Sequence, residues 1–203
     1  VGYAMGHDLT TVLLALLGLF VALQIVVRVA KRLVHIPAPA YADVFLDSPF
    51  RRLWQPPAKI IERSGIAPGM TVLEIGCGGG AIARHVARAL GPEGRLVALD
   101  VQAKMLARFR RKLDRPANRD IGNVTLVQAD ARELPFDDET FDLVYAVTAL
   151  PEVPDRPRAL AEVKRVLRPG GVLAVTELIV DPDYPLRRTT IRLCTEAGLA
   201  LDS

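Results

Sequence analysis

A short apolar run that ends in a cluster of glycines constrains the fold of this chain most strongly. Residues 70–75 are mainly apolar, which predicts a buried parallel strand. Residues 81–90 then predict a helix, and the turn between the two segments is made of Gly76, Gly78, Gly79 and Gly80. Glycine adopts positive φ and, without a Cβ, lets a ligand lie against the backbone. The first N–H groups of the helix point at the same place, so this strand–turn–helix predicts a ligand site.

Apolar strands and amphipathic helices alternate along the rest of the chain. The pattern predicts strands at residues 95–99, 123–127, 141–147 and 172–178, helices at 102–113, 156–167 and 185–197, and a turn at 168–171. Such alternation is typical of a parallel sheet with right-handed crossovers. The predicted fold class is therefore α/β, with a doubly wound, mostly parallel sheet that binds its ligand at the carboxyl ends of the strands.

Acidic residues follow or close three of these strands. Glu74, Asp100 and Asp130 all fall at predicted carboxyl ends, so we expect them at one edge of the sheet. Asp100 comes about 20 residues after the glycine turn, where a carboxylate can accept both hydroxyls of a ribose. A nicotinamide enzyme would use the same residue in the same way, so Asp100 alone does not identify the nucleotide.

Several segments together resemble the class I S-adenosylmethionine-dependent methyltransferases. The pattern Glu74-x-Gly76-x-Gly78-x-Gly80 is similar to the first motif of that family, which places an acidic residue two positions before the first glycine. Segments 127–136, 141–146 and 159–171 resemble later parts of the family in the same order. The resemblance covers about residues 70–177 and is strongest to the small-molecule branch that includes ubiquinone and menaquinone C-methyltransferases.

This resemblance implies a Rossmann-like fold, the cofactor S-adenosyl-L-methionine and a set of cofactor-binding residues. The glycine turn would border the methionine part, Asp100 would bind the ribose, Val101 would pack near the adenine, and Ala146 would lie beside the reacting methyl group. Asp130 and Ala131 would meet the adenine edge. The predicted binding residues are Glu74, Gly76, Cys77, Gly78, Gly80, Asp100, Val101, Asp130, Ala131 and Ala146. Trp54 and Gln55 are further candidates, because the segment before the first strand often closes over the cofactor in this family.

Neither a catalytic base nor a metal site is predicted. The two cysteines, Cys77 and Cys194, form no metal-ligand or disulfide pattern. Methyl transfer from a sulfonium needs alignment more than it needs proton transfer, and Glu152, in a loop, is the one weak candidate for a base. The catalytic residue is therefore left unassigned.

The N-terminal region predicts a membrane anchor. Residues 9–27 are almost entirely apolar and run all round a helix, with a length close to that of a bilayer core. Arg28, Lys31, Arg32 and His35 follow, which places this end on the cytoplasmic side. A cleaved signal peptide and a core or dimer helix are the alternatives. We expect an anchor with its basic flank at 1–35, a proline-containing linker at 36–48 and the catalytic domain at 49–203.

The anchor and the charge narrow the choice of substrate. A net charge of +3 is too small to favour nucleic acid, whereas a tethered domain meets lipidic acceptors at high effective concentration. The predicted activity is methylation of a small, lipid-soluble acceptor by a single-pass membrane protein. Two other classes stay open: a tethered cofactor-binding module without turnover, and an NAD-dependent oxidoreductase.

The end of the chain departs from the family pattern. The family sheet finishes with two further strands, and residues 199–203 are at most the beginning of the first of them. We therefore expect the last strands of the sheet to be missing from this chain. An open apolar edge would result.

Overall fold

The computed structural model describes residues 9–33, 53, 55–178 and 184–202, with the backbone alone for 28–33. Trp54, the linker predicted at 36–48 and the basic side chains that follow the apolar run lie outside this description. The elements, in order, are α1 (Leu9–Leu33), α4 (Pro57–Ser64), β1 (Thr71–Ile75), α5 (Ala83–Leu90), β2 (Arg95–Asp100), α6 (Ala103–Leu113), the 3₁₀ helix η2 (Pro116–Asn118), β3 (Val124–Gln128), β4 (Phe141–Val147), the 3₁₀ helix η3 (Leu150–Glu152), α7 (Arg156–Val166), β5 (Leu167–Thr176) and α8 (Arg187–Glu196).

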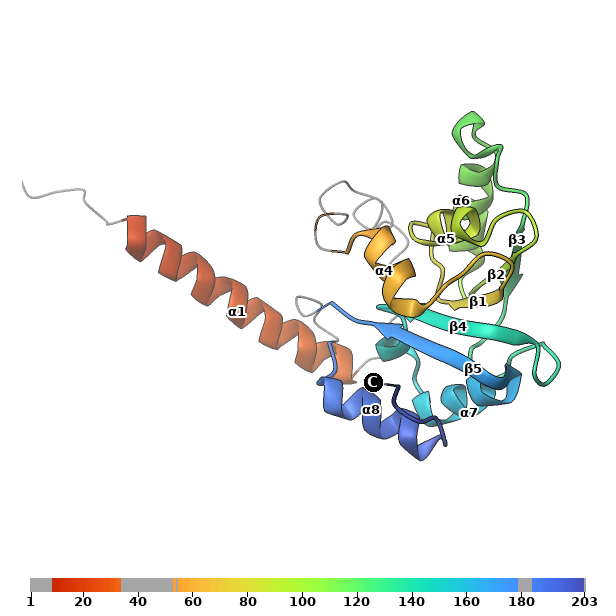
Figure 1. Ribbon diagram of the computed structural model, residues 1–203. Helices are drawn as coiled ribbons and strands as arrows, with labels where there is room; N and C mark the ends of the chain where they lie inside the picture. The colour runs from red at the N-terminus through yellow and green to blue at the C-terminus, as the bar shows by residue number, and fades with distance from the viewer. Residues whose placement is uncertain (1–8, 34–52, 54, 179–183, 203) are drawn as a thin grey trace, which may run out of the picture.

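The strands form one parallel sheet in the order β3-β2-β1-β4-β5. The chain starts at β1 in the middle, steps outward through β2 to the β3 edge, and then returns to β4 and β5 on the other side (Figure 1). The strand order therefore reverses between β1 and β4. In doubly wound sheets, ligands bind at the carboxyl ends of the strands beside such a reversal. The predicted fold class is confirmed.

Helices cover both faces of the sheet and make two apolar clusters. On one face, Val72 and Tyr145 pack with residues of α4, α5 and α6, among them Val86 and Phe109. On the other face, strand residues such as Leu73 pack with residues of α7, and α8 packs against that cluster from the outside. Alternate residues of each strand point to opposite faces, so Glu74 lies on the α5 side and Ala146 lies on the α7 side.

One sequence prediction is wrong in detail. The turn predicted at 168–171 lies inside β5, because Phe141 pairs with Leu167 and Leu143 pairs with Val172, so a shift of register absorbs the intervening residues. Residues 199–202, which the sequence allowed at most as the beginning of a sixth strand, are not in a strand. The N–H of Leu199 instead donates to the carbonyl of Cys194 at 2.9 Å, which closes the end of α8.

The N-terminal helix α1 projects from the rest of the described structure (Figure 1). Its stretch Leu9–Val27 has 19 residues, is long and apolar enough to cross a membrane, and is not buried within the described part of the structure. Because apolar side chains cover all sides of this helix, every side requires an apolar environment. The sequence prediction of an apolar helix is confirmed, and the structure itself shows no membrane.

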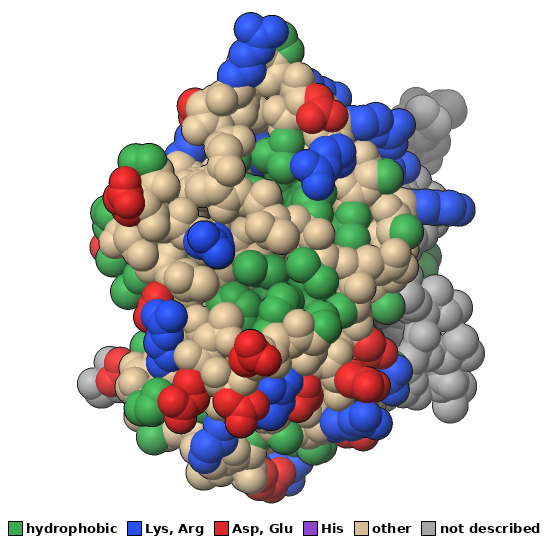
Figure 2. Space-filling view, turned by 90° about the vertical axis from the view of Figure 1, so that its right-hand side faces the viewer, with side chains coloured by type: hydrophobic (Ala, Val, Ile, Leu, Met, Phe, Trp, Pro, Cys, Tyr) green, Lys and Arg blue, Asp and Glu red, His purple; other side chains and the backbone are tan. Residues whose placement is uncertain are grey.

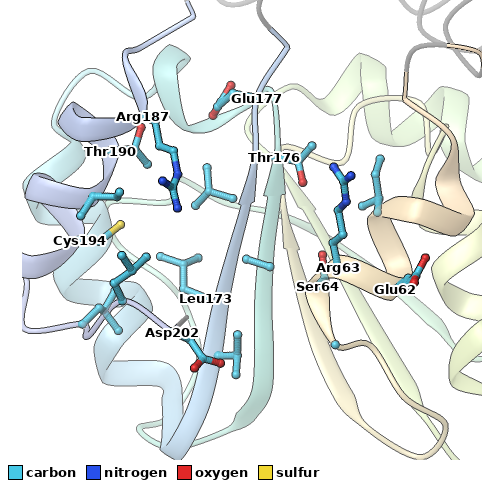
Figure 3. A pocket seen from close by; sticks show the side chains of 18 of the residues that line it. Glu62, Arg63, Ser64, Leu173, Thr176, Glu177, Arg187, Thr190, Cys194 and Asp202 are labelled. Atoms are coloured by element: carbon cyan, nitrogen blue, oxygen red, sulfur yellow. The ribbon is translucent and has the colours of Figure 1, made fainter.

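A groove runs along the edge of β5 that is not paired with β4. It has a volume of about 1180 Å³ and lies between α4 on one side and α8 on the other (Figure 3). Leu173 and Cys194 contribute apolar surface, and Arg63 and Glu62 contribute charge. Within the described residues β5 has no second neighbour, so this groove is the open edge expected from the sequence.

Charge is distributed unevenly over the surface. The last turn of α6 carries the exposed Arg110 and Arg111, whereas the neighbouring Lys112 is buried. On the face seen in Figure 2, basic side chains outnumber acidic ones in the upper part, and both kinds mix in the lower part. The protein therefore has a local basic surface although its net charge is only +3.

Candidate cofactor site

The sheet brings the predicted site residues to one edge. Ile75 pairs with Leu99 on one side and with Ala146 on the other, and Leu99 pairs with Val127. The residues that follow this row are the glycine turn after β1, Asp100 at the end of β2, and the loop after β3 that carries Asp130. The expectation that these groups share one edge is confirmed by the register.

The glycine turn is a tight loop held against β2. The N–H groups of Gly76 and Cys77 both donate to the carbonyl oxygen of Leu99, each at 2.9 Å. Gly76, Gly78 and Gly80 have φ values of +72°, +52° and +75°. These are left-handed conformations that residues with a Cβ rarely adopt, which explains the requirement for glycine at alternate positions.

Two of these glycines are also required by close packing, and the third is not. A Cβ on Gly80 would lie 2.3 Å from ring carbons of Phe109, and a Cβ on Gly76 would lie 2.4 Å from the Cβ of Ala149. A Cβ on Gly78 would have no atom within 4 Å. Gly78 therefore borders open space, as expected for the part of the loop that faces a ligand.

Asp100 joins the loop to the beginning of α6. Its Oδ2 accepts the N–H of Gly78 at 2.8 Å, and its Oδ1 accepts the N–H of Gln102 at 2.8 Å. The side chain is only 6% exposed. Burial raises the pKa of Asp100 above its usual value, and the N–H donors of Gln102 and Gly78 lower it in part. The carboxylate is thus fixed in orientation beside the glycine turn.

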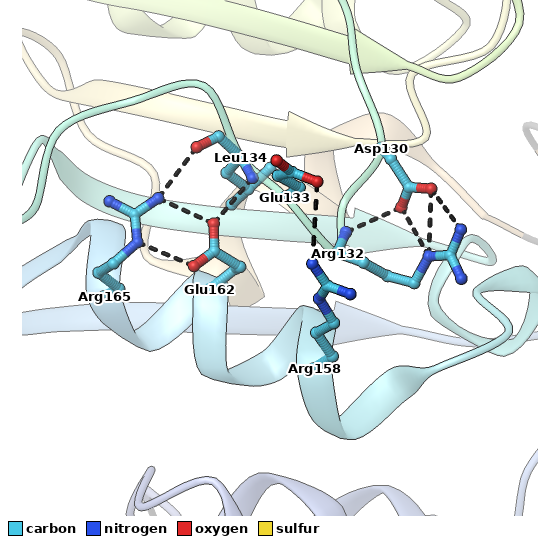
Figure 4. Close-up of polar contacts among 7 residues, drawn as sticks. All are labelled: Asp130, Arg132, Glu133, Leu134, Arg158, Glu162 and Arg165. Carbon is cyan, nitrogen blue, oxygen red and sulfur yellow. Dashed lines mark hydrogen bonds and ion pairs between the residues drawn. The ribbon is translucent and has the colours of Figure 1, made fainter.

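The loop after β3 is anchored to α7. The N–H of Leu134 donates to Glu162 at 2.8 Å, and Arg165 donates to the carbonyl of Leu134 at 2.9 Å (Figure 4). Arg165 also forms a salt bridge with Glu162 at 2.8 Å. These contacts fix the loop that carries Asp130.

Asp130 itself has a partner that the sequence reasoning did not identify. Arg132 donates to both of its carboxylate oxygens, at 2.7 Å from Nη2 to Oδ2 and 3.0 Å from Nε to Oδ1 (Figure 4). Hydrogen bonding from Arg132 lowers the pKa of Asp130. Each of the two side chains is 38% exposed. A carboxylate has lone pairs for further donors, so the pairing leaves Asp130 able to accept a hydrogen bond from a ligand.

Apolar members of the predicted set fall into two groups. Val101 is 54% exposed directly after Asp100, a position suited to packing against a flat ring. Ala131 and Ala146 are buried in the cluster on the α7 side. The nearby Gln128 side chain donates to the carbonyl of Val101 at 3.2 Å, so the end of β3 contacts the loop after β2 at this edge.

Glu74 and Cys77 are buried beneath the glycine turn. Burial raises the pKa of the Cys77 thiol, and the carboxylates of Glu74 and Asp100 raise it further. The thiol therefore stays protonated. Glu74 is 3% exposed and pairs in register with Tyr145, a residue that was not singled out from the sequence.

The loop after β4 contains a second feature that the sequence did not reveal. Thr148 has a φ of +53°, and its N–H donates to the carbonyl of Thr176 at 2.8 Å. Left-handed residues other than glycine concentrate at functional sites, where the surrounding structure holds them in place. This conformation positions Ala149 against Gly76, and no sequence signal distinguishes it from an ordinary turn.

The groove along β5 is not the predicted cofactor site. None of the ten predicted binding residues lines it, although Thr176 and Glu177 bring its upper end to the carboxyl edge of the sheet (Figure 3). The further candidate Gln55, which is buried, does line the groove, so the groove and the ten predicted residues share an edge of the sheet but no residue.

Comparison with known proteins decides the family. A model described as a methyltransferase domain matches residues 73–175, which is half of the chain. The chain belongs to the methyltransferase domain family. S-Adenosylmethionine is accordingly the cofactor that the family implies, rather than a nicotinamide dinucleotide.

Curated relatives of this methyltransferase domain are quinone-biosynthesis enzymes by name. The "Ubiquinone/menaquinone biosynthesis C-methyltransferase UbiE" of Idiomarina loihiensis is 44% identical over 127 residues, which are 62% of this chain and 49% of that protein. The UbiE of a Marinomonas species is 39% identical over 155 residues, or 74% of this chain and 59% of that one. The chain thus spans about half the length of the curated relatives it matches.

Solved structures show the same fold. A SAM-dependent methyltransferase from Aquifex aeolicus superposes with a TM-score of 0.72 at 25% identity, covering 80% of this chain and 89% of that one. The [4+2]-cyclase SpnF superposes with a TM-score of 0.54 at 31% identity, covering 61% of this chain and 44% of that one. The fold is therefore shared with proteins of more than one named activity.

Proposed function

We propose that this chain binds S-adenosylmethionine at the carboxyl edge of its sheet and transfers the methyl group to a small, lipid-soluble acceptor of the quinone-precursor class. The observation that carries the proposal is the pairing of Asp100 with the glycine turn. A buried carboxylate holds the N–H of Gly78 and lies where a bound ribose would meet it. A hydrogen bond to a charged group contributes roughly 1.5–3 kcal/mol.

The residues around this carboxylate suit the other parts of the cofactor. The turn from Gly76 to Gly80 would border the methionine part, because Gly78 leaves open space beside the backbone. Val101 would cover the adenine, and Asp130 with Ala131 would meet its edge. Ala146 ends near the point where the methyl group would be presented.

Catalysis here depends mainly on alignment. The bound cofactor supplies an activated methyl carbon, and transfer is an in-line displacement. The rigid loops place donor and acceptor and exclude water, and orientation of this kind contributes up to roughly 7–11 kcal/mol. No base is assigned, since the acceptor's own chemistry decides whether a proton has to be removed.

Two observations favour a lipid-soluble acceptor. The curated relatives at about 40% identity carry a name that refers to ubiquinone and menaquinone. The stretch Leu9–Val27 is suited to a single membrane span by length and composition, with the basic residues after it favouring a catalytic domain on the cytoplasmic side. The domain would then work at the surface of the bilayer in which such acceptors dissolve.

The test is methyl transfer by the full chain in lipid vesicles. Cofactor labelled on its methyl group is supplied together with demethylated quinone precursors, and the organic and aqueous phases are counted separately. We expect label in the organic phase, and none with the Asp100→Ala variant. Label found only in water-soluble products or in protein would contradict the proposal.

A binding module without methyl transfer is the second candidate. The observation that favours it is the similarity to SpnF, named as a cyclase on this fold. The same experiment separates the two, because such a module would bind the cofactor and leave its methyl group in place.

A further inference from the structure

The helix α6 and the turn after it carry a concentration of positive charge that the cofactor site does not use. Residues 103–119 contain seven basic residues and a single acidic one, Asp114, so this segment has a net charge of +6. The whole chain carries only +3, which means that the rest of the protein is net negative. Such an asymmetry is typical of proteins that meet an anionic partner on one side.

The basic side chains lie on the outer side of α6. Met105 and Phe109 are buried, and α6 packs on the sheet through the face that these two residues share. The exposed residues of α6 lie on the opposite side and continue into the turn at η2. The exposed cations form what we call the basic face: Lys104, Arg110, Arg111, Arg115 and Arg119. α6 lies in the upper part of Figure 1, at the height where Figure 2 shows basic side chains outnumbering acidic ones.

The charge of the basic face is not neutralised within the part of the chain that the structure describes. None of its five cations forms an ion pair with a described residue. Asp120, the acid next to Arg119, is bound instead by Arg88 of α5 at 2.6 Å. An anionic partner can therefore meet these side chains without breaking an existing ion pair.

Two kinds of anionic partner have to be compared, a nucleic acid and the headgroups of a bilayer. Sites for single-stranded nucleic acid combine basic residues with exposed aromatic rings on which the bases stack. Phe109 is the one aromatic residue in the sequence 103–119, and it is fully buried. The same chain carries a stretch, Leu9–Val27, that is long and apolar enough to cross a membrane. Clusters of basic residues held beside a span are attracted to anionic lipids, so the bilayer is the partner that the observations favour.

The connection between α1 and the domain leaves the orientation of the domain open. Residues 34–52 lie between the two and span at most roughly 65 Å when fully extended. A domain of about 150 residues is roughly 40 Å across. Any face of the domain can thus reach the bilayer. A basic face on an otherwise net-negative chain decides between them, because an anionic surface attracts that face and repels the rest.

We propose that the basic face docks the domain on anionic lipid headgroups and so fixes its orientation at the bilayer. Lys104 follows Asp100 by four residues, so one end of the basic face begins beside the cofactor edge of the sheet. Docking holds this edge close to the surface in which a lipid-soluble acceptor dissolves. The inference rests on the membrane span of the proposed function for the choice of partner, and it does not depend on methyl transfer.

The test is a lysine footprint of the full chain in vesicles. The chain is reconstituted in phosphatidylcholine alone or with about 30% phosphatidylglycerol and treated with acetic anhydride, which is uncharged and reaches both leaflets. Mass spectrometry gives the acetylation rate of Lys104 relative to Lys59, an exposed lysine of α4. One basic side chain at an anionic surface contributes about fivefold, so we expect Lys104 to react at least fivefold more slowly in the anionic vesicles. In 1 M salt, where the Debye length is about 3 Å, this protection should disappear.

Two matched double variants show which surface is responsible. Arg110→Glu with Arg111→Glu reverses two neighbouring exposed arginines of the basic face, and Arg187→Glu with Arg188→Glu makes the same change of charge on α8. The first pair should abolish the protection of Lys104, whereas the second should leave it intact. Melting temperatures measured in detergent check that both variants are folded.

Several outcomes would overturn the inference. Equal acetylation of Lys104 in the two kinds of vesicle excludes docking, and loss of protection in both double variants shows a general attraction of charge rather than this face. Protection by a single-stranded RNA added to neutral vesicles, with none from anionic vesicles, identifies a nucleic-acid surface instead.

Flotation of the same samples tests the membrane span separately. A chain that does not float with neutral vesicles lacks the anchor of the proposed function, and protection of Lys104 by anionic vesicles would still support docking. A chain that floats with both kinds of vesicle but shows no protection keeps the anchor and contradicts the docking alone.

Discussion

Replacing either Gly78 or Gly80 by alanine tests whether Gly78 faces the ligand while Gly80 is required for packing. Both positions have left-handed φ values, +52° and +75°. For a residue with a Cβ this conformation costs roughly 1–2 kcal/mol. The two sites differ in what the new methyl group meets, and that difference predicts opposite consequences for stability and for binding.

Gly80→Ala should damage folding. Its Cβ would lie 2.3 Å from ring carbons of the fully buried Phe109, and overpacking of this kind adds roughly 1–3 kcal/mol. The total, about 2–5 kcal/mol, corresponds to a fall in melting temperature of about 10 °C for a domain of this size. Gly78→Ala meets no atom within 4 Å, so the backbone term alone predicts a fall of about 4 °C.

For ligand binding we expect the opposite order: Gly78→Ala, which loses less stability, should bind the cofactor product more weakly. In Gly78→Ala the N–H still donates to Asp100, but the methyl group occupies the open space beside the loop, and we expect at least tenfold weaker binding of S-adenosylhomocysteine. Thermal unfolding and calorimetric titration of both variants measure the two effects. Equal destabilisation of the variants, or full affinity in Gly78→Ala, would refute the assignment of Gly78 to the ligand-facing side.

Three further predictions concern separate parts of the chain. Asp100→Ala removes the acceptor of two N–H groups, and each of these hydrogen bonds is worth roughly 1.5–3 kcal/mol. Calorimetric titration should therefore show at least hundredfold weaker binding of S-adenosylhomocysteine by a variant that still unfolds cooperatively. Retained affinity would contradict the proposed binding of the ribose by Asp100. Hydrogen bonding from Arg165 lowers the pKa of Glu162. The stability that this carboxylate contributes to the fold is therefore present above the ordinary pKa of about 4.3 and is lost as pH falls through the lowered pKa. When the free energy of unfolding is measured against pH, Glu162→Gln should lose less stability in that window than the unaltered chain, and identical profiles would contradict the prediction. Leu16→Arg combined with Phe20→Asp places two charges in the apolar stretch, each of which costs roughly 2.5–3.5 kcal/mol of membrane-insertion free energy. Carbonate extraction should therefore release this variant and leave the unaltered chain in the membrane. Release of both proteins would contradict the membrane anchor.

The sequence was sufficient for the strands and for the edge where they meet. Runs such as residues 95–99 and 141–147 are mostly apolar, as buried parallel strands require, and β2 and β4 occupy nearly those bounds. The beginning of β5 was missed because Pro169 and the glycines after it normally terminate a strand. Here they are absorbed by a shift of register against Phe141 and Leu143.

The positions of the carboxylates in the site could be predicted from the sequence, but the residues that they contact could not. Asp100 was identifiable because its distance from the glycine turn is fixed by one strand–helix–strand unit. The pairing of Glu74 with Tyr145 depends on which strands are neighbours and in what register, and neither is contained in local spacing. The left-handed Thr148 is likewise imposed by its surroundings.

Titration of the purified full chain with S-adenosylhomocysteine and with NAD tests the central claim most directly. If the carboxylates and the glycine turn form a site for S-adenosylmethionine, S-adenosylhomocysteine should bind with a dissociation constant in the micromolar range, and NAD should give no heat. Heat with NAD alone, or with neither compound, would contradict the account.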